Sequence, residues 1–137
     1  MPLTVEDRFD VLDAKECDPG NVMTIDDSGA LVRCHSEYDR RVAGVISGAG
    51  NLRPGIIFDG EISTAGRVPI ALLGTVFSKA VADDSPIAVG DLLTTSNVPG
   101  HAMKAADPSR AVGAIIGKAL EPLPSGIGLI RILIALQ

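Results

Sequence analysis

Aromatic side chains are nearly missing from this sequence. Only three Phe and one Tyr occur in 137 residues, and there is no Trp. The core must therefore be built from Ile, Val, Leu and Ala. Single-stranded nucleic acids and sugars usually bind on aromatic platforms, so the shortage counts against both. The net charge is −5, and the basic residues form no stripe along the sequence, so we expect no nucleic-acid partner.

Signals for export, membrane insertion and metal binding are missing too. No basic cluster followed by an apolar run begins the chain, so no signal peptide is predicted. The longest apolar run, "GIGLIRILIALQ", is too short to span a bilayer as a helix. We expect a soluble protein without a membrane partner, in the cytoplasm or on a virion. Cys17 and Cys34 lack C-x-x-C spacing, and with His35 they lack a fourth ligand, so we expect free thiols and no metal. No cofactor motif occurs, and no cofactor is expected.

Turn residues are abundant instead. Fifteen Gly and nine Pro are spread along the chain and separate short runs rich in Val, Ile and Leu. This pattern predicts an all-β fold with little helix, a compact β-sandwich or a barrel-like domain. The predicted strands are Phe9–Asp13, Asn21–Ile25, Ala30–Cys34, Arg41–Ser47, Gly55–Phe58, Val68–Lys79, Asp91–Thr95, His101–Ala105, Ala111–Leu120 and Gly128–Leu136.

An internal repeat divides the chain into two related β units, 17–48 and 86–117, at an offset of about 70 residues. We predict a single domain in which an acidic leader (1–16) precedes the first unit. A bridging strand (66–80) joins the units, and a C-terminal strand (127–137) follows. The matched pairs are Gly20 and Gly90, Asn21 and Asp91, Val22 and Leu92, Met23 and Leu93, Thr24 and Thr94, Arg41 and Arg110, Gly44 and Gly113, Ile46 and Ile115, and Gly48 and Gly117.

Several residues are predicted to shape turns. A glycine permits the positive φ that tight turns need, and an aspartate accepts hydrogen bonds from turn amides. In the long strand 66–80, which contains almost no charge, a glycine near the middle indicates a bend that lets the strand serve two sheets. The predicted structural residues are Gly20, Gly29, Gly74, Gly90, Asp91 and Gly100.

The C-terminal strand is apolar on both faces, so it is either central in a sheet or covered by another subunit. An exposed strand of this kind would promote aggregation, and oligomerisation is the solution we favour. We expect an interface on this strand and on the bridging strand. Its predicted residues are Val68, Ile70, Leu72, Ile130, Ile132 and Ile134.

Catalytic and ligand-binding arrangements are weakly indicated. Asp91, Ser96 and His101 can be drawn as a triad, but nothing in their spacing requires one. The glycine-containing loops Ser47–Asn51 and Ser96–His101 leave open a glycan- or ligand-binding module, against which the low aromatic content argues.

The order of the motifs resembles a known domain family. "EDRFDV", "DPGNVMTIDDSGAL", "GRVPIALLGTV", "PIAVGDLLTTSNVPGHAMKA" and "GLIRILIAL" follow one another over Phe9–Leu136, most specifically over Gly66–Lys104. The resemblance is to the C-terminal intramolecular-chaperone, autoproteolytic domain of bacteriophage tail-spike and appendage proteins. It implies a homotrimeric assembly module, with a phage or fibre protein as a further partner. In autoproteolytic members, acidic residues near the N-terminus perform self-cleavage, and these correspond to Glu6, Asp7 and Asp10. We expect a non-enzymatic module, with a self-cleaving peptidase as the alternative.

Overall fold

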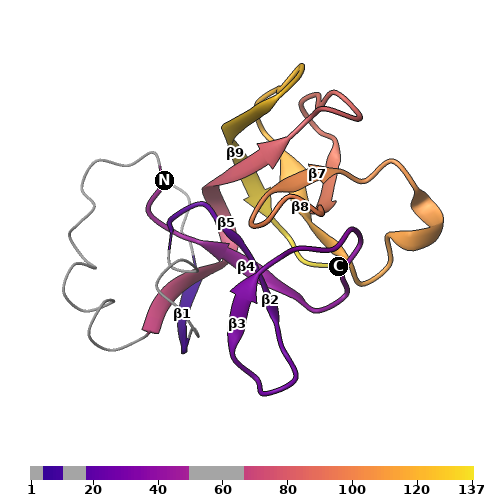
Figure 1. Cartoon of the computed structure of the whole chain (residues 1–137). Helices are drawn as coiled ribbons and strands as arrows, with labels where there is room; N and C mark the ends of the chain where they lie inside the picture. Colours follow the sequence, from indigo (N-terminus) through magenta and orange to yellow (C-terminus); the bar gives the residue numbers. More distant parts are fainter. Residues whose placement is uncertain (1–4, 11–17, 50–66) are drawn as a thin grey trace.

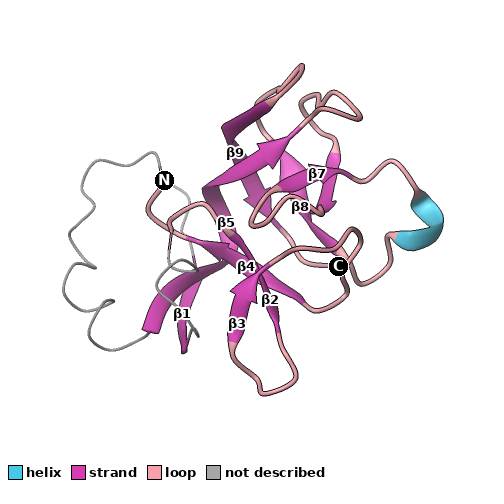
Figure 2. Ribbon diagram, viewed as in Figure 1, coloured by secondary structure: helices cyan, strands magenta, loops and turns pink. Residues whose placement is uncertain are grey.

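The computed structural model describes residues 5–10, 18–49 and 67–137, and only the backbone of 5–10, 67 and 68. It confirms the all-β prediction, because this part of the chain contains strands, turns and a single 3₁₀ turn, Pro108–Arg110 (Figure 2). None of the described elements is a helix long and apolar enough to cross a membrane. The strands are β1 (Val5–Asp10), β2 (Val22–Ile25), β3 (Leu31–Arg33), β4 (Val42–Ile46), β5 (Arg67–Val81), β6 (Leu92–Thr95), β7 (Ala102–Lys104), β8 (Ile115–Ala119) and β9 (Ile127–Ile134).

The described strands form one nine-stranded sheet in the order β3-β2-β4-β5-β7-β6-β8-β9, with β1 paired to β5. A further pairing of β5 with β9 closes β5, β7, β6, β8 and β9 into a barrel (Figure 1). All pairings are antiparallel except that of β5 with β7, which meet at Ala80 and Ala102. The predicted strand Gly55–Phe58 lies outside the described residues.

β5 belongs to two groups of strands. Its first half pairs with β1 on one side and β4 on the other, whereas Gly74–Val81 pairs with β9. The change of partner falls between Leu73, which faces Val5, and Gly74, which faces Ile134. Gly74 has a φ of +99°, a conformation that strongly favours glycine. The bridging strand is therefore the last strand of one group and the first strand of the next.

The strand pairings repeat between two units, and the repeat extends over five strands in each. β2 pairs with β3 and β4 as β6 pairs with β7 and β8, and a bulge interrupts both at matched positions, Met23/Thr24 and Leu93/Thr94. β1 pairs with the first half of β5 as the second half of β5 pairs with β9. We call β1–β4 with the first half of β5 the first unit. The second unit is the rest of β5 with β6–β9.

The repeat alignment has two blocks of matched pairs, Gly20–Thr24 with Gly90–Thr94 and Arg41–Gly48 with Arg110–Gly117. The second block is wrong by four residues. Gly44 lies opposite Met23, and Gly117 lies opposite Leu93, so these two glycines correspond at an offset of 73, not 69. Gly113 instead lies in a turn with a φ of +82°, and the predicted strand Ala111–Leu120 begins only at Ile115. Backbone crowding explains the match. A Cβ at Gly44 would lie 2.6 Å from the carbonyl oxygen of Ala71, and one at Gly117 would overlap the carbonyl oxygen of Leu133.

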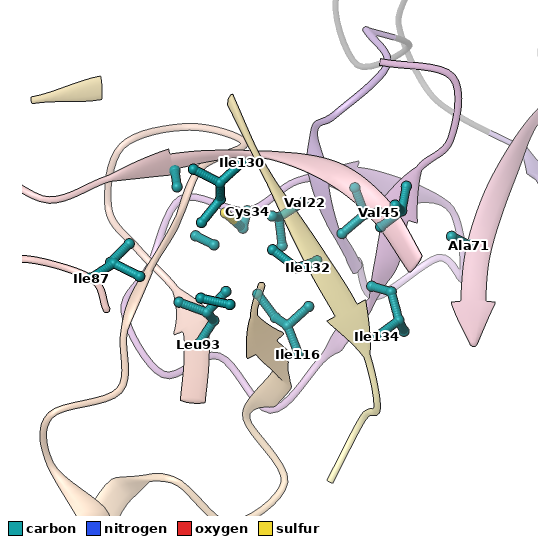
Figure 3. Packing of buried hydrophobic residues seen from close by; sticks show 14 of the residues in the cluster. Val22, Cys34, Val45, Ala71, Ile87, Leu93, Ile116, Ile130, Ile132 and Ile134 are labelled. Atoms are coloured by element: carbon teal, nitrogen blue, oxygen red, sulfur yellow. The ribbon is translucent and has the colours of Figure 1, made fainter. Parts of the chain in front are cut away.

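The same repeat organises the core. The inner residues of the first unit form one cluster. Their counterparts belong to a second, larger cluster, shown in Figure 3, which also contains Val22, Cys34, Val45 and Ala71 of the first unit. Neither cluster contains an aromatic residue, as the composition predicts. In three of the six matched pairs a large side chain in one unit corresponds to an alanine in the other, and in the remaining three both side chains are large. The matched inner pairs are Met23 and Leu93, Leu31 and Ala102, Ala43 and Ile116, Ile46 and Ala119, Ile70 and Ile132, and Leu72 and Ile134.

Cys34 is a free thiol fully buried in this core. Burial raises its pKa to about 11 from an ordinary value of 9.0, because the thiolate would lose its hydration. Since the unfolded chain releases this proton first, the thiol contributes stability that is complete below pH 9.0 and is lost as the pH rises towards about 11.

We therefore predict that the Cys34→Ala variant has a flatter stability profile than the wild type in alkali. Urea unfolding at pH 8 and pH 10 measures this, with each protein compared to itself. The wild type is expected to lose on the order of 1–2 kcal/mol more than the variant over this interval. Equal losses in both proteins would show that the Cys34 thiol does not carry the effect.

Candidate functional site

The outward side of β9 is the most apolar exposed strand surface of the described chain. Ile130, Ile132 and Ile134 point into the barrel and are at most 3% exposed. The alternate residues Ile127, Leu129 and Leu133 point outward and are 61%, 42% and 39% exposed. An antiparallel strand with one face in water normally carries polar residues on that face, and here Arg131 is the exception among the outward positions.

β5 continues this surface. Its register places Thr75 beside Leu133, Phe77 beside Arg131 and Lys79 beside Leu129. Phe77 is half-buried, and Leu73, one strand position before the switch at Gly74, is 53% exposed. We call the surface made by Leu73, Phe77, Ile127, Leu129 and Leu133 the β5–β9 outer face.

Two basic side chains, those of Lys79 and Arg131, belong to this face, and a carboxylate lies beside each residue. The Lys79 ammonium lies 3.3 Å from a carboxylate oxygen of Asp18. The backbone N–H of Arg131 donates to Oε1 of Glu121 at 2.8 Å, which orders the adjoining loop. Arg131 lies within the face between Leu129 and Leu133, and arginine, unlike lysine, is enriched at protein interfaces. The face thus combines aliphatic side chains with basic ones, an arrangement that fits protein contact better than chemistry.

The predicted interface residues need correcting. Ile70, Ile130, Ile132 and Ile134 are buried inside the chain itself, so they have no surface to offer a second copy. Leu72 is half-buried against the core of the first unit, and the side chain of Val68 lies outside the described residues. β9 is apolar on both faces, as expected, but the residues predicted on it belong to the face that points into the barrel. Arg131 was the available signal, because a charged residue marks the face in contact with water.

The possible triad does not form. The Ser96 hydroxyl donates to the carbonyl oxygen of His101 at 2.7 Å, and Nδ1 of His101 lies 2.8 Å from the carbonyl oxygen of Pro99. The Asp91 carboxylate accepts from the backbone N–H of Ala88 at 2.8 Å. Each polar group is therefore engaged with the backbone of its own turn, and no nucleophile–base pair exists among these three residues.

The loop Ser96–His101 is a connector between the units. The Gly100 N–H donates to the carbonyl oxygen of Cys34, and its carbonyl oxygen accepts from the Val22 N–H, both at 2.9 Å. A side chain at Gly100 would collide with Asn21, so the loop is closely fitted rather than open to a ligand. The other loop considered, Ser47–Asn51, lies partly outside the described residues. All five predicted turn glycines have positive φ angles: Gly20, Gly29, Gly74, Gly90 and Gly100.

A second junction joins the units at Tyr38, which the sequence reasoning missed. Tyr38 has a φ of +54°, and its hydroxyl oxygen accepts from the Asp107 N–H at 2.8 Å. The Arg110 guanidinium lies 4.5 Å from the ring centroid, a cation–π contact. An open depression lined by residues 36–41 surrounds it. The only Tyr of a nearly aromatic-free chain was the signal for this contact.

The acidic residues implied by the resemblance lie on β1. Its backbone pairs with β5, with Glu6 opposite Ala71, Asp7 opposite Ile70 and Asp10 opposite Arg67. The side chains of Glu6, Asp7 and Asp10 lie outside the described residues, and so does Cys17.

Comparisons with known proteins give one likeness. No family model matches the chain, and no curated protein matches it. Among solved structures, the chain is similar to the crystal structure of the head fibre gp8.5 N base of bacteriophage phi29. The TM-score is 0.49 at 17% sequence identity, and the alignment covers 98% of this chain and 95% of that one.

Proposed function

We propose that this chain is a non-enzymatic assembly module that associates with further copies of itself through the β5–β9 outer face. The observation that carries the proposal is the aliphatic outer side of β9, where Ile127, Leu129 and Leu133 are exposed on a regular strand. A rigid, closed barrel presents them, so little conformational entropy is lost when they are covered.

The free energy gained by burying these side chains supports association. Burying a fully exposed aliphatic side chain contributes roughly 1.5–3 kcal/mol, and these side chains are about half exposed, so each contributes roughly 1 kcal/mol. Three such side chains from each copy, with Leu73 and Phe77 beside them, give a gain comparable with the roughly 4–15 kcal/mol that association costs in lost freedom. The aliphatic face would in turn be protected from the edge-to-edge and face-to-face aggregation to which exposed apolar strands are prone.

The number of copies and the setting come from the sequence resemblance. The motif order over Gly66–Lys104 resembles domains that assist trimerisation of phage fibres, so we propose a trimer that works in the assembly of a phage appendage. β5 and β9, which present the proposed face, carry two of the motifs on which that resemblance depends, "GRVPIALLGTV" and "GLIRILIAL".

Light scattering coupled to size-exclusion chromatography tests the proposal. The wild-type chain of 14.1 kDa is expected to elute at a mass corresponding to three copies at micromolar concentration. A single species with the mass of one chain, unchanged on concentration, would contradict it.

A further inference from the structure

Each unit carries a row of three outward residues across three neighbouring strands. In the first unit, Val22 on β2 pairs with Val45 on β4, which pairs with Ala71 on β5. In the second unit, Leu92 on β6 pairs with Lys118 on β8, which pairs with Leu133 on β9. The registers make the two rows equivalent position by position. We call them the first row and the second row.

The two rows have opposite surroundings. Every residue of the first row is fully buried, and all three belong to the cluster that contains the barrel residues Ile132 and Ile134 (Figure 3). In the second row Leu92 and Leu133 are each 39% exposed, and Lys118 is exposed between them. The outer side of the first unit is therefore covered by the second unit, whereas the equivalent side of the second unit has no cover in the described chain.

The middle residue of each row accounts for this difference in burial. Val45 contributes apolar surface at the middle of the first row, whereas Lys118 places an ammonium at the same point of the second. Lys118 forms no ion pair within the described part of the chain. Covering a bare ammonium with apolar surface costs several kcal/mol, more than the two flanking leucines would recover. A lysine on an exposed strand is a known protection against unwanted sheet contacts.

We infer that Lys118 limits self-association by keeping its own strand position and Leu92 in water, whereas Leu133, the third residue of the row, belongs to the β5–β9 outer face. This rests on the proposed function, and it specifies which surface a second copy is prevented from covering. The occupant that Lys118 excludes is a second copy of this chain, because Lys118 lies directly beside Leu133, at the border of the face proposed to join copies. Association is then confined to the β5–β9 outer face, with Leu133 as its last residue towards β8, and assemblies stay finite.

The test is the Lys118→Val variant, which restores the residue type of the first row. Sedimentation velocity of wild type and variant at equal concentration is expected to show additional, larger species only in the variant. Valine suits an exposed strand position, and a thermal melt checks that the variant is folded. An unchanged or smaller size distribution for the folded variant would overturn the inference.

The Lys118→Glu variant is the matched control, because it keeps a charge at the position and reverses its sign. It is expected to sediment as the wild type does. If Lys118 instead bound a carboxylate of a second copy, both variants would dissociate, and the inference would be wrong while self-association stood. If the wild type is a monomer, the proposed function fails separately. The gain of larger species in Lys118→Val would still be measurable.

Discussion

A Gly117→Ala variant is expected to lose about 3 kcal/mol or more of folding stability. The added Cβ would overlap the carbonyl oxygen of Leu133. The backbone atoms of Leu133 and Ala135 leave no space into which the Cβ could move. β8 pairs with β9 at this point, so relief requires the strands to separate and the barrel to open. Overpacking in a core usually costs about 1–3 kcal/mol, and a backbone collision between paired strands belongs at or beyond the upper end. Urea or thermal unfolding of the purified variant measures the loss.

The matched control is Gly29→Ala. Gly29 has a φ of +90° in the β2–β3 turn, but a Cβ there meets no atom within 4 Å. Only the backbone conformation is penalised, at about 1 kcal/mol. If Gly117→Ala were no more damaging than Gly29→Ala, close approach of β8 and β9 would not be what requires glycine at position 117.

The paired change Leu129→Asp and Leu133→Asp is expected to leave a folded monomer. Both side chains point outward from β9, so the core is untouched. In an assembly they would place like charges from several copies against one another and remove two aliphatic contacts per copy. We expect association to weaken at least about hundredfold, which corresponds to roughly 3 kcal/mol. Analytical ultracentrifugation measures the assembly, and circular dichroism the fold.

The Val112→Asp variant controls for the added charge. Val112 is 86% exposed in the turn before β8, away from the β5–β9 outer face. It is expected to assemble as the wild type does. If the Leu129→Asp, Leu133→Asp protein assembled as strongly as the wild type, the β5–β9 outer face would not be the surface that joins copies.

The fold was accessible from the sequence because its signals are local. Glycine-led turns and short β-branched runs gave the strands, and the β2–β3 turn over Asp26–Gly29 is closed by the Asp26 carboxylate, which accepts from the Ser28 and Ala30 amides. The first repeat block, from Gly20 to Thr24, was matched correctly at an offset of 70. The bend at Gly74 follows from a single glycine in a long apolar strand.

The rest depended on contacts between distant strands. The second repeat block was misaligned because similar letters surround Gly44 and Gly113, whereas the true equivalence is decided by which backbone passes closest to each glycine. The aliphatic residues of β9 do not distinguish its two faces, because both faces carry them, and Arg131 is the one residue of the strand that does. Which side became the core was set by the pairing of β9 with β5 and β8, and this turned its isoleucines inward.

The labelling rate of a cysteine placed at Leu133 tests the account most directly. A Leu133→Cys protein is prepared with Cys17→Ser, while Cys34 is buried with its pKa raised to about 11 and stays unreactive in the folded chain. The account predicts that a thiol reagent labels position 133 more slowly as protein concentration rises, because a second copy covers it. A cysteine at Val112 is expected to react at a constant rate. A labelling rate at position 133 that is equally independent of concentration would contradict the claim that this face joins copies of the chain.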